Sequence, residues 1–238
     1  MSENNVNCSC KKVYTGIFVM IGFILSGLFI GNGLKAIANQ EQHVTVKGLA
    51  EREVLANKVV WPLPYKCVSN DMQQLYDEIE NNRNVVLSFL KDGGITDNEI
   101  VISAPAVTDR LAQNYVPDNI KFRYQAEAVI TVISPQVEKV IELMGKQIEL
   151  MKDGIIISNE YNYQTQFEYT ALNEIKPAMV EEATRNARAV AQKFAEDSDC
   201  KLGNIKQATQ GQFSISSDET TPQIKNIRVV TTVKYALD

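Results

Sequence analysis

The sequence has fewer positively than negatively charged residues and a single histidine. Its 238 residues carry 24 lysines and arginines against 29 aspartates and glutamates, a net charge of -5, with no basic stripe. Binding a phosphate backbone needs concentrated lysine and arginine, so we do not expect nucleic acid as a partner.

The shortage of histidine bears on catalysis. The one histidine is His43, and a Ser-His-Asp hydrolase needs a histidine to activate its nucleophile. Glu160 and Glu168 could act as a glycosidase pair, but on one extended strand they would stand about 26 Å apart. We therefore expect a protein that is not an enzyme, with no catalytic residue, no metal site, no cofactor and no identifiable small-molecule ligand.

Charge is missing altogether from one long stretch near the N-terminus. From Val13 to Leu34 the sequence is uncharged, and as a helix it would extend about 33 Å, enough to cross a hydrocarbon core of about 30 Å. A core helix would show a polar face, which this stretch lacks. A cleaved signal peptide is the alternative, because Ala36-Ile37-Ala38 resembles a cleavage site. The run exceeds a usual signal-peptide core, so we favour a retained anchor.

The flanking lysines predict the orientation of this anchor. Lys11 and Lys12 precede it and Lys35 alone follows it, so the tail 1–12 is expected in the cytoplasm. A linker over 35–41 then leads to a domain over 42–238 on the periplasmic or extracytoplasmic side. Cleavage after Ala38 would also export this domain, as a periplasmic protein.

Cysteine is sparse, with four residues in two pairs. Cys8 and Cys10 fall in the predicted tail and form a poor metal-ligand set. Cys67 and Cys200 fall in the exported part, where disulfides persist. The sequence leaves two readings of that second pair, a Cys67–Cys200 disulfide or two separate thiols.

Periodicity predicts an α+β domain with the element order ββα-ββα-βα-ββ and about three helices on one mixed, largely antiparallel sheet. The expected strands cover 43–47, 54–65, 100–107, 122–133, 155–167, 205–215 and 227–235, with a turn at 48–51. The expected helices cover 72–90, with an N-cap at Ser69-Asn70, 135–151, and 173–199. In the last of these a narrow face of small and apolar residues, from Met179 to Phe194, predicts close approach to a sheet. Thr96 and Glu99 predict a capping box on a short helical turn.

Two features within these strands predict surfaces. Pro62 and Pro64 remove amides from one side of their strand, which predicts an unpaired sheet margin there. Tyr161, Tyr163, Phe167 and Tyr169 all fall on odd positions, so we expect one aromatic strand face. That face could pack on helices within the domain or serve self-association.

Short motifs in a fixed order carry a resemblance to a known family. They are Val44-Thr45-Val46-Lys47-Gly48, Phe89 to Ile95 with Ile100, the alanine-rich stretch 183–191, and Lys201 to Ile205. With them, about residues 42–237 resemble the SIMPL-domain family, the periplasmic immunogenic proteins of bacterial envelopes. The family often carries Pro-Asp before the alanine of its second strand, whereas Ala56-Asn57-Lys58 stands here.

The resemblance implies an exported domain that assembles into ring-like or hollow oligomers and is linked to envelope or oxidative stress. It supplies no catalytic residue. We therefore expect a membrane-anchored protein with a structural or interaction role as a homo-oligomer. The alternative is a ligand-binding or sensory module that acts through the membrane helix, where Gly22 and Ser26 form a small-x-x-x-small pair. A hydrolase is the weakest hypothesis.

Overall fold

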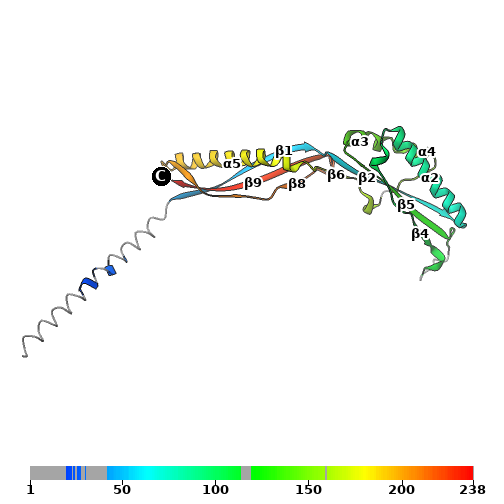
Figure 1. Ribbon diagram of the computed structural model, residues 1–238, viewed down its shortest axis with the longest axis horizontal. Helices are drawn as coiled ribbons and strands as arrows, with labels where there is room; N and C mark the ends of the chain where they lie inside the picture. The colour runs from blue at the N-terminus through cyan, green and yellow to red at the C-terminus, as the bar shows by residue number, and fades with distance from the viewer. Residues whose placement is uncertain are drawn as a thin grey trace, which may run out of the picture. The chain divides into compact units, whose positions relative to one another are not determined.

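The computed structural model of the protein describes residues 20–22, 24, 26–27, 30, 42–113, 119–158 and 160–237 (Figure 1). These residues divide into two compact units. The smaller unit contains the described residues of 1–47, 187–209 and 232–238, and the larger one those of 48–186 and 210–231.

The elements form two antiparallel sheets with helices, which confirms the α+β class. The strands are β1 (His43–Leu55), β2 (Lys58–Ser69), β3 (Ile100–Ile102), β4 (Ala106–Asp109), β5 (Tyr124–Ser134), β6 (Gln166–Glu168), β7 (Leu202–Gln210), β8 (Ser214–Ser216) and β9 (Ile224–Leu237). The helices are α2 (Met72–Asp92), α3 (Val137–Lys146), α4 (Ile148–Lys152) and α5 (Leu172–Asp197), with 3₁₀ turns η1 (Asp97–Glu99), η2 (Arg110–Ala112) and η3 (Tyr161–Tyr163).

The five-stranded sheet, in the order β3-β5-β2-β6 with β4 also pairing β5, holds the main core. Strands β2 and β5 pair from Val59 opposite Ser134 to Ser69 opposite Tyr124. Alternate residues of both strands are buried, and α2 and α3 pack on this sheet (Figure 1). The core therefore lies between one face of the sheet and these helices.

Helix α2 illustrates how local sequence defines these elements. Asp71 caps it by accepting a hydrogen bond from the Gln74 amide at 3.0 Å. Four of its apolar residues at helical spacing are buried: Leu75, Ile79, Val86 and Leu90. It ends at Gly93, and Gly94 adopts a φ of 79°, which glycine tolerates best. The sequence predicted this helix, but placed its cap at Ser69-Asn70.

The two prolines of β2 lie where the sequence predicts an unpaired margin. Strand β6 pairs only with Lys58, Val59 and Val60, so it ends before Pro62. Beyond it, the carbonyl of Pro64 accepts a hydrogen bond from the Ser158 amide at 2.8 Å. The expected unpaired margin is confirmed at Pro62, whereas it is wrong at Pro64 and Tyr65, which pair with Ser158 and Ile157.

The four-stranded sheet has the order β1-β9-β7, and β8 also pairs β9. In the smaller unit, Ala187 and Ala191 of α5 pack with strand residues of β1 and β9. In the larger unit, Met179 and Ala183 of α5 do the same. Alanine at these positions allows close approach of helix and sheet, as predicted.

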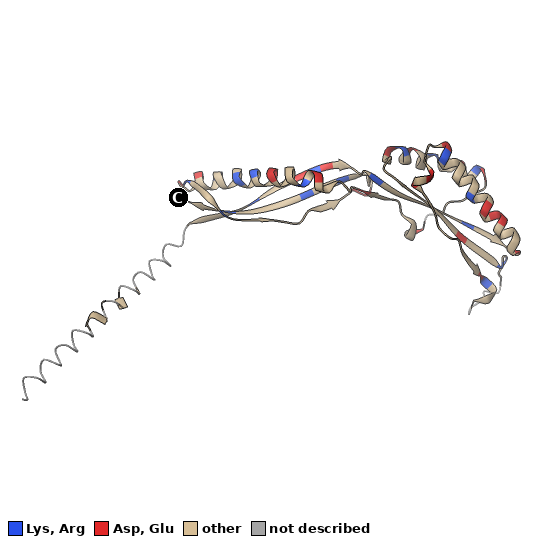
Figure 2. Ribbon diagram, viewed as in Figure 1, with Lys and Arg blue, Asp and Glu red and all other residues tan. Residues whose placement is uncertain are grey.

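Both signs of charge alternate along α5 (Figure 2), with Arg185 bonded to Glu181 at 2.8 Å. We expected Val190 and Phe194 on the apolar face of α5, but their side chains are 40% and 53% exposed. That part of the prediction is wrong.

Several other expectations are wrong. The sheet is not single but double, and β1 runs straight through the expected turn at 48–51, because Gly48 and Ala50 are buried on its inner side. The chain turns instead at Ala56-Asn57.

The later part of the chain is also more broken than predicted. The expected helix over 135–151 is divided at Gln147, whose amide bonds back three residues to Met144 at 3.2 Å. The expected strand over 205–215 is divided into β7 and β8. The expected strand over 155–167 is reduced to the 3₁₀ turn η3, the short β6 and one bridge between Tyr65 and Ile157.

Among the residues that the structure describes, no helix combines the length and apolarity needed to span a bilayer. Most of the stretch from Val13 to Leu34, and all of the tail 1–12, lie outside the described residues.

Two glycines give a matched test of the packing. A Cβ on Gly211 would lie 2.6 Å from the carbonyl oxygen of Val230, whereas a Cβ on Gly145 meets nothing within 4 Å. We expect Gly211→Ala to destabilise the full chain by about 1–3 kcal/mol through overpacking. Gly145→Ala, inside α3, should stabilise it by about 0.5–1 kcal/mol.

Urea unfolding midpoints of the two variants and the parent check this expectation. Equal midpoints for all three proteins would contradict the close approach at Gly211.

Candidate functional site

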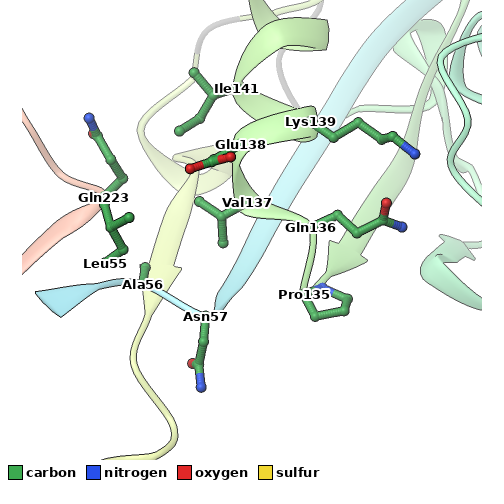
Figure 3. Close-up of a pocket in the computed structure, with 10 residues that line it drawn as sticks. All are labelled: Leu55, Ala56, Asn57, Pro135, Gln136, Val137, Glu138, Lys139, Ile141 and Gln223. Atoms are coloured by element: carbon green, nitrogen blue, oxygen red, sulfur yellow. The ribbon is translucent and has the colours of Figure 1, made fainter.

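A cavity of about 550 Å³ lies beside the first turn of α3 in the larger unit (Figure 3). Its size falls within the range of small-molecule clefts, about 300–1,000 Å³. Its lining residues are Leu55, Ala56, Asn57, Pro135, Gln136, Val137, Glu138, Lys139, Ile141 and Gln223.

The turn between β1 and β2 forms one wall, and backbone hydrogen bonds hold it on two sides. The Ala56 amide donates to the Gln223 carbonyl at 2.8 Å, and the Asn57 amide donates to the Glu168 carbonyl at 3.0 Å. The Asn57 side-chain oxygen accepts from the Thr170 amide at 2.8 Å. Hydrogen bonds of Ala56 and Asn57 therefore anchor this wall, and the apolar side chain of Leu55 in the same wall is exposed.

Helix α3 forms the other wall. Val137, Glu138 and Ile141 extend from it toward Leu55 and Gln223 in Figure 3. Lys139 extends away and donates to the Gly94 carbonyl at 3.2 Å (Figure 3). The cavity therefore presents aliphatic side chains beside one carboxylate.

A buried carboxylate, Glu99, positions the start of α3. One of its oxygens accepts from the Ser134 hydroxyl at 2.5 Å and from the Gln136 side-chain amide at 3.1 Å. The other accepts from the Thr96 amide at 2.9 Å and the Thr96 hydroxyl at 2.8 Å. Ser134 in turn accepts from the Gln136 amide at 2.9 Å. We call Thr96, Glu99, Ser134 and Gln136 the Glu99 network.

The network determines the protonation of Glu99. Burial opposes ionisation, but the hydrogen bonds from Ser134, Thr96 and Gln136 favour the charged form more strongly and lower the Glu99 pKa to about 2. The carboxylate is therefore charged at neutral pH and is fully occupied in joining η1 to the end of β5. It is a structural anchor for the cavity wall rather than a proton carrier.

The titratable groups in the cavity lining are Glu138 and Lys139. The lining contains no serine, cysteine or histidine, so no hydroxyl, thiol or imidazole is placed to attack or to act as a base. In the described part of the chain, no three metal-ligating side chains are grouped to hold an ion.

The two cysteines of the domain are free thiols in the structure. Burial raises the Cys67 pKa to about 11, and its sulfur accepts a hydrogen bond from the Asn82 side chain at 3.4 Å. A thiol with this pKa reacts poorly. Cys200 is half-buried and donates to the Ser198 carbonyl at 3.3 Å. The Cys67–Cys200 disulfide stays a prediction.

The four aromatic residues expected on one strand face have different surroundings. Tyr161 is 86% exposed in η3, and Tyr163 in the same turn hydrogen-bonds Glu127. Phe167 packs on the main core, whereas Tyr169 packs with Met179 and Ala183. The prediction of one aromatic strand face is wrong, because no strand spans these four residues. Their part in self-association stays a prediction. The anchor ends Val13 and Leu34 lie outside the described residues.

Sequence reasoning missed both the cavity and most of the Glu99 network. It identified the capping box of Thr96 and Glu99, which the structure confirms at η1. Ser134 and Gln136 approach Glu99 from more than thirty positions away, at separations of 35 and 37 residues, so no local pattern reveals them.

Comparison with known proteins identifies the family of this domain. Residues 44–235 match the family model described as SIMPL, protein of unknown function (DUF541). The chain therefore belongs to the SIMPL family, as its motifs predicted. No curated protein matches the chain.

The Glu99 network predicts how stability depends on pH. Because folding lowers the Glu99 pKa to about 2, its stabilisation is present above the ordinary carboxyl range and is lost as pH falls from about 4.5 to about 2. Glu99→Gln should lower the free energy of unfolding by about 1–2 kcal/mol at pH 7. The deficit should shrink toward pH 2.

Urea unfolding between pH 2 and pH 7 measures this deficit, with Glu138→Gln as the control at an exposed carboxylate of α3. A deficit that stays constant over this pH range would contradict the role assigned to Glu99.

Proposed function

We propose that the protein is a membrane-anchored, exported SIMPL domain with a non-catalytic structural or interaction role in the cell envelope. The observation that carries the proposal is the uncharged stretch from Val13 to Leu34. It is long enough for a bilayer and ends nine residues before His43, where β1 begins. A retained anchor would therefore tether the domain close to the membrane surface.

Self-association is the second part of the proposal. A short segment of the larger unit exposes three large aliphatic side chains, Ile148 at 67%, Met151 at 60% and Ile156 at 70%. Apolar side chains gathered on a surface are typical of interaction sites. Together with the family's tendency to assemble, they favour a homo-oligomer.

A ligand-binding or sensory module is the alternative function, and the cavity beside α3 favours it. Leu55, Val137 and Ile141 would contact an aliphatic group, with Glu138 beside them. Such a module would signal through association of the membrane helix, for which Gly22 and Ser26 are suitably small. Saturable binding of a small molecule, lost on Val137→Arg, would favour this alternative over the structural role.

Protease accessibility tests the proposed location. When the full chain is expressed in a bacterial host, protease added to intact spheroplasts should digest residues 42–238, and a cytoplasmic marker should survive. The protein should also stay in the membrane after alkaline carbonate washing, because an apolar helix crosses the bilayer.

Two results would contradict the exported location or the retained anchor. Protection of the domain in intact spheroplasts, with digestion after lysis, would overturn the exported location. Release in carbonate with a new N-terminus at Asn39 would show a cleaved signal peptide instead of an anchor.

A further inference from the structure

The outer strands of the two sheets differ in how their free edges are protected. Strands β1 and β7 stand at the ends of the four-stranded order, and β3 and β6 at the ends of the five-stranded order. A free edge offers unpaired amides and carbonyls, which can pair with another chain unless proline, a bulge, a cover or charged side chains oppose it.

The five-stranded sheet has such protection on both sides. On the β5 side, Ile102 opposes Ile130 and Ala106 opposes Glu127, so three residues, 103–105, stand against two. That is a β-bulge, and it contains Pro105. On the β2 side, Pro62 and Pro64 remove the amides beyond β6.

Strand β1 is protected differently, by the charged side chains of Lys47, Glu51 and Glu53. It is 13 residues long and contains no proline. The carbonyl of Gln42 accepts from the Leu237 amide, and the Ala56 amide donates to Gln223, both at 2.8 Å. Because these even-numbered ends face β9, strand alternation turns the backbone groups of the odd residues toward the free edge. Consistent with this, the Leu49 carbonyl accepts from the side chain of Asn186 on α5 at 2.8 Å.

We propose that β1 pairs antiparallel with β1 of a second copy of this chain, around a two-fold axis at Leu49. The proposal rests on the self-association proposed above and names its surface. In this register Leu49 opposes Leu49 of the second copy, and Lys47 opposes Glu51 of the second copy. Symmetry repeats the Lys47–Glu51 pair on the other side of the axis.

Charge complementarity favours this register over those with an axis at Lys47 or at Glu51. The odd residues of β1 have exposed side chains on one face, so opposing residues meet across the new pair. An axis at Lys47 would place two lysines opposite each other, and an axis at Glu51 would place two glutamates. An axis at Leu49 avoids both repulsions. It places Lys47 opposite Glu51 twice and Leu49 opposite Leu49, an apolar contact.

Existing contacts of the edge are compatible with this pairing. Asn186 is exposed, and the Leu49 carbonyl has a second lone pair, so their bond can persist or be exchanged. Glu51 lies 3.4 Å from Arg228 of β9, with both side chains about half exposed. It would then lie between Arg228 and Lys47 of the second copy.

Cysteine crosslinking of the full chain tests the axis. In a background of Cys8→Ser, Cys10→Ser and Cys200→Ser, with buried Cys67 retained, Leu49→Cys should form a disulfide-linked dimer on mild oxidation. Directly opposed residues in a hydrogen-bonded antiparallel pair have Cα atoms about 5.5 Å apart, which a disulfide can bridge. Glu53→Cys is the control, since the two copies of residue 53 would stand about 27 Å apart.

Charge reversal tests the register. Lys47→Glu should weaken dimerisation about tenfold, because it replaces both attractive pairs by repulsive ones. The double variant Lys47→Glu/Glu51→Lys should restore dimerisation. The mass of the detergent-solubilised full chain, measured over a dilution series, reports this, with the unfolding midpoint of each variant as a folding control.

The outcomes separate this inference from the proposed function. A monomeric parent at all concentrations would overturn self-association and the β1 interface together. An oligomeric parent without crosslinking at Leu49→Cys would overturn the β1 interface alone. If Lys206→Glu on β7 lowered the assembled mass and Lys47→Glu did not, the β1 interface would also be overturned. Assembly would then use the opposite edge of the sheet.

Discussion

The structure depends on one constraint, that the backbone hydrogen-bonding groups at a sheet edge must be paired or protected. The five-stranded sheet satisfies it within the chain, through Pro62 and Pro64 on one side and the bulge containing Pro105 on the other. The four-stranded sheet ends in β1, a long strand without proline. The proposed pairing of two copies through β1 satisfies the same constraint by association.

The interior of the larger unit is arranged around a second polar requirement. Glu99 is charged and buried, so its oxygens need donors, and Thr96, Ser134 and Gln136 supply them. Those bonds tie the end of β5 and the first turn of α3 to η1. They keep one wall of the cavity in place, whichever role the cavity has, so the network is a structural foundation for either proposed function.

The sequence predicted those features that local patterns encode. Helix α2, the capping box at Thr96 and the margin at Pro62 all follow from residues close together in the chain, and all are confirmed. Gly48 misled the prediction, because a glycine that reads as a turn is a buried position of β1. The Glu99 network and the cavity join distant residues, and the alternation of apolar residues over 155–167 does not form a continuous strand. These features depend on tertiary packing, which a single sequence does not display.

In the proposed assembly the free edge of β1 is paired. Hydrogen exchange at single-amide resolution tests this pairing most directly, comparing the concentrated full chain with the chain dissociated by dilution. Amides of the odd residues Thr45, Lys47, Glu51 and Glu53 should exchange slowly in the concentrated protein and rapidly on dilution, whereas those of the even residues should stay protected in both. Rapid exchange of the odd amides at every concentration, in a protein whose mass shows assembly, would contradict the account.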